Sequence, residues 1–169
     1  IEMLTVVREN FKKVVLLLNV GNIIDMNDIN RIAPDAVLYV WQGGMTGGKG
    51  TADVLTGKVS PSGKLPDTIA YKVSDYPSDA NFGREENRDI YAEDIYVGYR
   101  YFETFAKEKV LYPFGFGLSY TEFEIKTEKA EITEGAVKLS VSVKNIGSYK
   151  GKEVIEVYCE APQGRLGKA

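Results

Sequence analysis

The hydrophobic pattern of this chain changes near residue 118, and that change constrains the fold more than any other feature. Before it, continuous apolar runs alternate with segments of helical periodicity. After it, apolar and polar residues alternate with a period of two. Two patterns in one chain predict two kinds of structure, an α/β part and an antiparallel β part. We therefore expect one domain over residues 1–117 and a second over 118–169.

Two buried strands are predicted in the first part. Val14–Leu18 and Ala36–Trp41 are continuous apolar runs, as expected of strands covered on both faces in a parallel sheet. Helical segments over residues 1–11 and 25–34 precede the first and the second run, and residues 51–56 form a third helix. The order α-β-α-β-α predicts a partial parallel α/β sandwich with right-handed crossovers.

Local signals set the expected helix ends. Asp25 is a candidate N-cap, and Asp28 in the first turn favours the helix dipole. Pro34 is expected to end that helix, and Gly57 the helix over residues 51–56.

Residues 57–117 are rich in Gly, Pro, Asp and Asn, apart from a dense aromatic stretch over 90–105. Beyond them, Phe123–Ile125, Val137–Val143 and Val154–Tyr158 alternate as strands of a half-buried antiparallel sheet. An immunoglobulin-like or fibronectin-like sandwich needs about seven strands and roughly 100 residues. The second domain is therefore expected to be an incomplete β-sandwich, and the chain a piece of a longer protein.

Composition excludes several kinds of chemistry. The chain contains no histidine, so a Ser-His-Asp triad or a His-ligated metal site cannot form within it. Its one cysteine, Cys159, cannot form an internal disulfide or a cysteine cluster for zinc. We expect no cofactor and no metal, and the absence of disulfides favours a cytoplasmic location.

Charge and hydropathy exclude two classes of partner. Lys and Arg total 21 against 24 Asp and Glu, with no basic run, which argues against a nucleic-acid surface. The longest apolar run, Val14–Leu18, is far shorter than the roughly 20 residues of a membrane span. The sequence indicates no particular oligomeric state.

A glycine-rich loop over residues 43–51 lies between a predicted strand and a predicted helix, the context of a phosphate-binding loop. Gly43 and Lys49 fit the spacing G-x-x-x-x-G-K, but Gly50 lies where Ser or Thr would contact magnesium. Thr51 is one residue late, which turns its hydroxyl by about 100° on a helix. A nucleotide-binding module remains an alternative, as does a structural accessory module.

Paired carboxylates could hydrolyse a glycoside if held roughly 5–5.5 Å apart. Glu93 and Asp94 are adjacent and point to opposite faces of an extended segment. Asp25 and Asp28 are explained by capping, and Glu85-Glu86 reads as a solvated loop. No pair is a good catalytic couple.

Ligands of open α/β sheets bind outside the carboxyl ends of the strands. Here these ends carry Asn19–Asn22 and Trp41–Thr46. Trp41 offers an apolar face for a sugar ring, and Gln42 a donor and an acceptor for hydroxyl groups; the alternative is that Trp41 packs inside. We predict four residues close to a bound sugar: Asn22, Trp41, Gln42 and Met45.

An ordered series of sequence blocks resembles the second domain of glycoside hydrolase family 3. The tail from Glu153 to Lys168, with Ala161-Pro162-Gln163-Gly164, resembles the start of that family's fibronectin-like domain. The blocks are Asn19-Val20-Gly21-Asn22, Trp41-Gln42-Gly43-Gly44, Ala52-Asp53-Val54-Leu55-Thr56-Gly57, Pro61-Ser62-Gly63-Lys64-Leu65-Pro66, Asp94-Ile95-Tyr96-Val97-Gly98-Tyr99-Arg100-Tyr101 and Tyr112-Pro113-Phe114-Gly115-Phe116-Gly117-Leu118-Ser119-Tyr120.

The resemblance implies a retaining β-glucosidase or β-xylosidase acting on β-linked oligosaccharides or glycosides. In this family an aspartate on a (β/α)8 barrel is the nucleophile, and a glutamate in a Gly-Glu-Gly type loop is the acid/base. Neither motif occurs here. We therefore assign no catalytic residue to this chain, expect it to need the barrel domain of the same protein, and expect it alone to be inactive.

Overall fold

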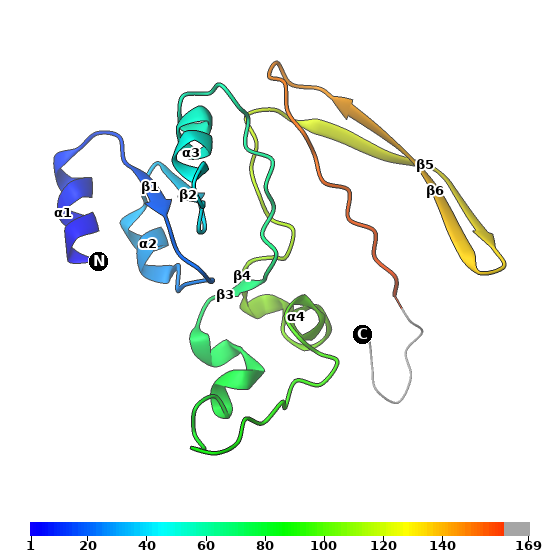
Figure 1. The fold of residues 1–169 in the computed structure, drawn as a ribbon, viewed down its shortest axis with the longest axis horizontal. Helices are drawn as coiled ribbons and strands as arrows, with labels where there is room; N and C mark the ends of the chain where they lie inside the picture. Colours follow the sequence, from blue (N-terminus) through cyan, green and yellow to red (C-terminus); the bar gives the residue numbers. More distant parts are fainter. Residues whose placement is uncertain (161–169) are drawn as a thin grey trace. The chain divides into compact units, whose positions relative to one another are not determined.

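The computed structural model describes residues 1–160, which form two compact units (Figure 1). The first unit comprises residues 1–48, 65–116 and the segment from Glu156 onward; the second comprises residues 49–64 and 117–155. The division into domains over residues 1–117 and 118–169 stays a prediction. Residues 161–169 of the second predicted domain lie outside the described residues.

The first unit opens with the predicted alternation of helices and strands. Helix α1 (Glu2–Asn10), strand β1 (Val15–Leu18), helix α2 (Asn27–Ile32) and strand β2 (Ala36–Tyr39) follow in this order. The two strands pair in parallel, with Val15 opposite Ala36 and Leu18 opposite Tyr39. The parallel sheet expected from the two apolar runs is confirmed, although each strand is shorter than its run.

The prediction that both strands are buried on both faces is wrong for the described residues. Val15, Leu17 and Val37 are exposed, whereas Leu18 is buried. The sheet has only two strands within residues 1–160, and each strand has four residues. A sheet this small leaves part of its surface without a covering layer, so a continuous apolar run does not by itself bury both faces.

The core of this unit gathers side chains from distant parts of the sequence. Leu18, Met26, Ile29 and Ile69 are buried together, and the half-buried ring of Tyr112 packs against them. Ile69 belongs to β3 (Ile69–Ala70), which pairs antiparallel with β4 (Val110–Tyr112). The short sheet thereby joins the loop-rich middle of the chain to the α/β part.

Helix α2 begins later than predicted. Its N-cap is Met26, and the Asp25 carboxylate accepts a hydrogen bond from the backbone N–H of Asn27 at 2.8 Å. Asp25 therefore lies one residue before the N-cap rather than at it, but its side chain still satisfies a backbone N–H of the first helical turn. The helix ends at Ile32 because Ala33 takes a left-handed conformation (φ 55°), one residue before Pro34.

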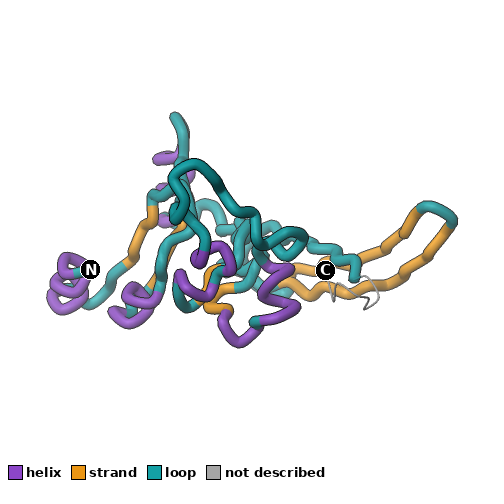
Figure 2. Tube along the Cα trace, turned by 90° about the horizontal axis from the view of Figure 1, so that it is seen from below, coloured by secondary structure: helices purple, strands orange, loops and turns teal. Residues whose placement is uncertain are grey.

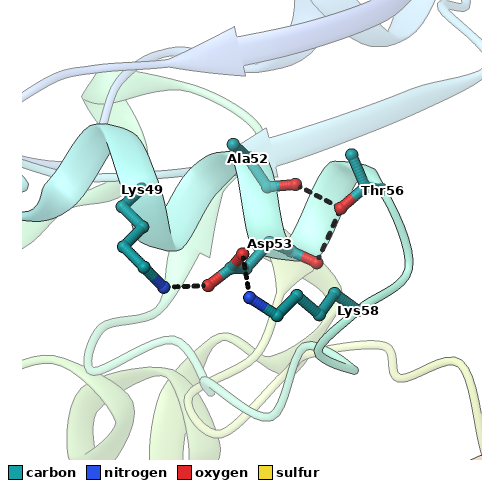
Figure 3. A network of polar contacts seen from close by, with 5 residues as sticks. All are labelled: Lys49, Ala52, Asp53, Thr56 and Lys58. Atoms are coloured by element: carbon teal, nitrogen blue, oxygen red, sulfur yellow. Dashed lines mark hydrogen bonds and ion pairs between the residues drawn. The ribbon is translucent and has the colours of Figure 1, made fainter.

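Helix α3 (Gly47–Leu55) also departs from the prediction, because it begins within the glycine run rather than after it. Its end agrees: Gly57 adopts φ 72°, and its N–H donates to the carbonyl of Val54 at 3.0 Å. Asp53 forms ion pairs with Lys49 at 2.7 Å and Lys58 at 3.2 Å (Figure 3). The hydrogen bonds from these two ammonium groups lower the pKa of the Asp53 carboxyl, and the one from Lys49 has the larger effect.

The middle of the chain is largely loop and turn, as Figure 2 shows, with short helical segments. The 3-10 segments are η1 (Val73–Asp75), η2 (Pro77–Ala80) and η3 (Lys107–Lys109). Helix α4 (Tyr99–Phe105) lies in the aromatic stretch and buries Phe102. A second core cluster of Ala70, Phe102 and Ala106 holds this region together.

The second unit contains an antiparallel ribbon of β5 (Phe123–Thr133) and β6 (Ala136–Asn145). Ile125 lies opposite Val143 and Ile132 opposite Val137, so their side chains share one face. The register shifts between Thr127 and Lys129. This irregularity inserts one residue and keeps the apolar residues on the same face along the ribbon.

The third predicted strand is not formed. Val154–Tyr158 alternates apolar and polar residues, but residues 151–160 have no strand pairing. A period of two indicates an extended segment with one apolar face, and such a segment becomes a strand only beside a partner with free backbone groups. Among the described helices, none is long and apolar enough to cross a membrane.

Asp35, just before β2, is the charged centre of the α/β part. Its carboxylate contacts Lys13 Nζ at 2.8 Å and Arg8 Nη1 at 3.0 Å, and accepts the N–H of Val14 at 2.9 Å. The bond from Lys13 and that from Val14 lower the pKa of this carboxyl from 3.8 to about 2.

Because the folded-state pKa of Asp35 lies below the unfolded value of 3.8, its contribution to stability is complete above pH 3.8. We expect that contribution to disappear as the pH falls toward about 2. Urea unfolding of the chain across this range checks it. In Asp35→Asn the acid loss of stability becomes shallower, whereas Asp28→Asn, which removes an exposed pair with Arg31, leaves the steep loss in place. Equal profiles for Asp35→Asn and the unchanged chain would contradict the assignment.

Candidate functional site

The carboxyl ends of β1 and β2 lie at the same edge of the parallel sheet and carry the predicted sugar-binding residues. Because the strands are parallel and in register, Asn19–Asn22 and Val40–Thr46 leave the sheet side by side. The N–H of Val40 still donates to the carbonyl of Leu18 at 3.0 Å. The two loops therefore start from a fixed separation.

Tyr39, the last residue of β2, links the two loops. Its hydroxyl donates to the backbone carbonyl of Asn22 at 2.8 Å, and its ring lies 4.5 Å from the Trp41 ring at 44°. Burial raises the pKa of Tyr39 above its usual 10, so the phenol stays protonated as a donor. The sequence prediction did not include Tyr39, although in the strand predicted over residues 36–41 its i, i+2 spacing to Trp41 would place both side chains on one face.

Gln42 turns back toward the first loop. A side chain built at Gly21 would lie 2.9 Å from Gln42 Nε2, so the absence of a side chain at Gly21 makes room for the amide. At Gly43, a Cβ atom would lie 2.7 Å from the Cα of Gly47. Glycine is thus required at Gly43, where the close neighbour is backbone, whereas at Gly21 the neighbour is the end of the flexible Gln42 side chain.

The structure brings three of the four predicted residues together. Trp41 is half-buried, and Asn22 and Gln42 are exposed beside it. Met45 is 105% exposed and makes no part of the cluster. We call the group of Asn22, Tyr39, Trp41 and Gln42 the strand-end cluster; it offers an indole face and an amide, and no carboxylate.

Two members of the acidic pairs considered from the sequence form ion pairs with arginine. Glu85 forms a two-point ion pair with Arg88 at 2.9 and 3.0 Å, and Asp28 pairs with Arg31 at 2.8 Å. Within residues 1–160 no three His, Cys, Asp or Glu residues gather as metal ligands. Glu85 and Asp28 are thus engaged by arginine, and the described residues form no such cation site.

The glycine loop does not form a phosphate site. Lys49, the residue that would contact phosphate oxygens, is held by the Asp53 carboxylate on the same helix (Figure 3). Gly50 supplies no hydroxyl for a metal ion. The nucleotide-binding alternative is therefore not supported.

Comparison with known proteins decides the family. The family model "Glycosyl hydrolase family 3 C-terminal domain" matches residues 1–120, more than half of the chain. This chain belongs to glycoside hydrolase family 3. The resemblance inferred from the sequence blocks is confirmed, and the alternative of a purely structural accessory module is not supported.

Relatives of this family 3 chain extend the match beyond the α/β part. A beta-glucosidase of Ruminococcus albus is 66% identical over 96% of the chain, and beta-glucosidase A of Butyrivibrio fibrisolvens is 46% identical over 99%. A solved beta-glucosidase from Paenibacillus barengoltzii is 55% identical over 98% of the chain, with a TM-score of 0.91.

The family 3 chain matches only part of each relative. It spans 17% of the Ruminococcus protein, 22% of the Butyrivibrio protein and 19% of the solved Paenibacillus chain. Its fold of mixed helices and small sheets is that of the family's C-terminal domain.

Proposed function

We propose that this chain works as part of a retaining β-glucosidase that hydrolyses terminal β-linked glucose or xylose from oligosaccharides or glycosides. The observation that carries the proposal is the near-complete match of the chain to proteins named beta-glucosidase, at 66% identity in one case. The barrel domain of the same protein would supply the nucleophile. The chain would supply part of the α/β sandwich and a surface beside the substrate.

The strand-end cluster is the proposed contribution of this chain to sugar binding. The face of an aromatic ring attracts the polarised C–H groups of a pyranose, and Trp41 has one face against Tyr39. The Gln42 amide can both donate to and accept from sugar hydroxyls. Met45 is retained only as an outer contact because its side chain is fully exposed.

The second unit is proposed to begin a fibronectin-like sandwich. The apolar face of the β5–β6 ribbon includes Ile132 and Val137, which are 87% and 58% exposed. A sandwich covers such a face with a second sheet. For the location we propose a reducing cytoplasm, which suits the free thiol of Cys159.

The proposal is tested by separating the chain from the rest of the enzyme. Incubated alone with an aryl β-glucoside, the chain is expected to show no turnover above the uncatalysed rate, because it contains neither catalytic carboxylate motif. A chimaera in which it replaces the matched 163 residues of the Ruminococcus albus beta-glucosidase is expected to be active. Release of the aryl group measures both.

The unaltered Ruminococcus enzyme serves as the positive control, and the same enzyme with the 163 residues deleted serves as the negative control. Specific turnover by the isolated chain would overturn the assignment of the carboxylates to other domains. A folded but inactive chimaera would overturn the proposal that this chain belongs to a β-glucosidase.

A further inference from the structure

We propose that Tyr39 is a positioning residue that holds Trp41 and the Asn22 loop in the arrangement that binds the sugar. The inference rests on the proposed function of the strand-end cluster. It adds a residue outside the four predicted from the sequence, and it assigns that residue a role without contact to the substrate.

The first step of the argument is the place of Tyr39 at the end of a paired strand. Tyr39 lies opposite Leu18 in the parallel register, and its ring packs against the buried cluster that contains Leu18. The backbone of Tyr39 and its ring are therefore held by the core. A side chain anchored in this way can fix whatever it touches beyond the sheet.

The second step is the conformation of Trp41. Its φ is 52°, a left-handed value that tryptophan seldom adopts. Such a conformation persists only where the surroundings hold it. The ladder bond from Val40 to Leu18 fixes the backbone before the turn, and the Tyr39 ring at 4.5 Å is the described ring contact of the indole.

The third step is the hydrogen bond to the neighbouring loop. The Tyr39 hydroxyl donates to the Asn22 carbonyl at 2.8 Å, while the Asn22 side-chain oxygen accepts the N–H of Ile23 at 2.8 Å. The backbone carbonyl of Asn22 is thereby held by Tyr39, and its side-chain oxygen by the adjacent backbone N–H of Ile23. One tyrosine thus ties the backbone of the first loop to the indole on the second.

Holding the Trp41 indole in place before the sugar binds should strengthen binding. An indole free to rotate loses conformational freedom when a sugar stacks on it, and that loss weakens binding. An indole already packed on Tyr39 loses less. Removing the Tyr39 ring should therefore raise KM while leaving kcat nearly unchanged, since the ring touches no reacting atom.

The first measurement uses the single tryptophan of the chain, whose fluorescence reports only Trp41. Tyr39→Ala is expected to shift the emission to longer wavelength, because the indole loses its ring partner and becomes more exposed. Tyr39→Phe keeps the ring contact and is expected to keep the emission maximum. Unchanged emission in Tyr39→Ala would overturn the positioning role.

Tyr112→Ala is the matched control for this measurement. The Tyr112 hydroxyl donates to Asn30 Oδ1 at 2.9 Å, and its ring lies 5.0 Å from the Phe116 ring. The variant therefore loses a comparable hydrogen bond and ring pair beside the same core cluster, while the described ring contact of Trp41 with Tyr39 is kept. Its native emission maximum should stay where it is, which separates lost positioning from a general loss of stability.

The second measurement is kinetic and uses the active chimaera. Tyr39→Ala is expected to raise KM for an aryl β-glucoside about 10-fold with kcat within about 2-fold, and Tyr39→Phe to recover most of the loss. Trp41→Ala tests the proposed surface itself and should raise KM at least as much.

The two proposals fail in different ways. If Trp41→Ala leaves KM unchanged, the strand-end cluster does not bind the sugar and the proposed function of this surface is wrong. If Trp41→Ala raises KM but Tyr39→Ala does not, the surface stands and the positioning role of Tyr39 is wrong. A fall in kcat with unchanged KM for Tyr39→Ala would also overturn that role.

Discussion

Replacing Phe102 by alanine is expected to lower the free energy of unfolding of the chain by about 3–5 kcal/mol. Phe102 is 1% exposed at the centre of the cluster it forms with Ala70 and Ala106. Its ring lies 5.3 Å from the ring of Tyr76, nearly perpendicular at 88°. The substitution removes these contacts and leaves a cavity that the surrounding helix and strands cannot fill completely. Urea unfolding followed by circular dichroism measures the change.

Phe105→Ala, on the same helix, is the matched control for this prediction. Phe105 is 56% exposed, and its ring contacts Tyr96 and Tyr101 at 4.8 and 5.8 Å. The same change of side chain at an exposed position is expected to cost about 1 kcal/mol or less. Similar losses for the two variants would show that Phe102 is not the centre of this core.

Replacing Gly117 by alanine is expected to lower the free energy of unfolding by about 2–3 kcal/mol. A Cβ atom at this position would lie 2.4 Å from the carbonyl oxygen of Gly63 and 3.1 Å from Lys64 Cδ. The nearer atom belongs to the backbone and cannot rotate away. The same Lys64 donates to the Gly117 carbonyl at 2.9 Å and pairs with Glu153, so a shift of either segment strains this polar contact. Thermal and urea unfolding measure the loss.

Gly63→Ala is the matched control, because Gly63 supplies the carbonyl oxygen that a Cβ atom at Gly117 would meet. A Cβ at Gly63 meets no atom within 4 Å, and the residue does not have a positive φ. The substitution leaves the Gly63 carbonyl in place and is expected to change stability by about 0.5 kcal/mol or less. If Gly117→Ala were equally harmless, the close approach of the two segments would be refuted.

Sequence patterns predicted the α/β part well because its signals are local. Continuous apolar runs indicated both parallel strands, and Gly57 marked the end of α3 through its positive φ. The start of α3 was missed because glycine disfavours helix interiors, yet the helix begins at Gly47. Helix propensity is weak evidence for where this helix begins, because the preceding turn is stabilised by its own backbone hydrogen bond. In that bond the N–H of Gly47 donates to the carbonyl of Gly44.

The missed features depend on neighbours distant in the sequence. Val154–Tyr158 has the alternation of a strand, but pairing requires a partner that the alternation does not specify. At the strand ends, Asn22 and Gln42 could be predicted from the topology of parallel sheets. Tyr39 could not be distinguished from an ordinary core residue without its 2.8 Å bond to Asn22. Met45 lies outside the strand-end cluster, since sequence proximity to Trp41 says little about where a side chain packs.

The amino end of helix α3 is expected to be less stable than its carboxyl end. Gly47, Gly48 and Gly50 occupy its first turn, and each glycine costs about 1 kcal/mol of helix propensity relative to alanine. Its last turn is tied by the Thr56 hydroxyl to the Ala52 carbonyl at 2.8 Å and by the ion pair of Asp53 with Lys58 at 3.2 Å, while Lys49 of the first turn also reaches Asp53 (Figure 3). From glycine propensity we expect the helix to unwind first at its amino end, which would lengthen the turn that follows Trp41 at the expense of α3.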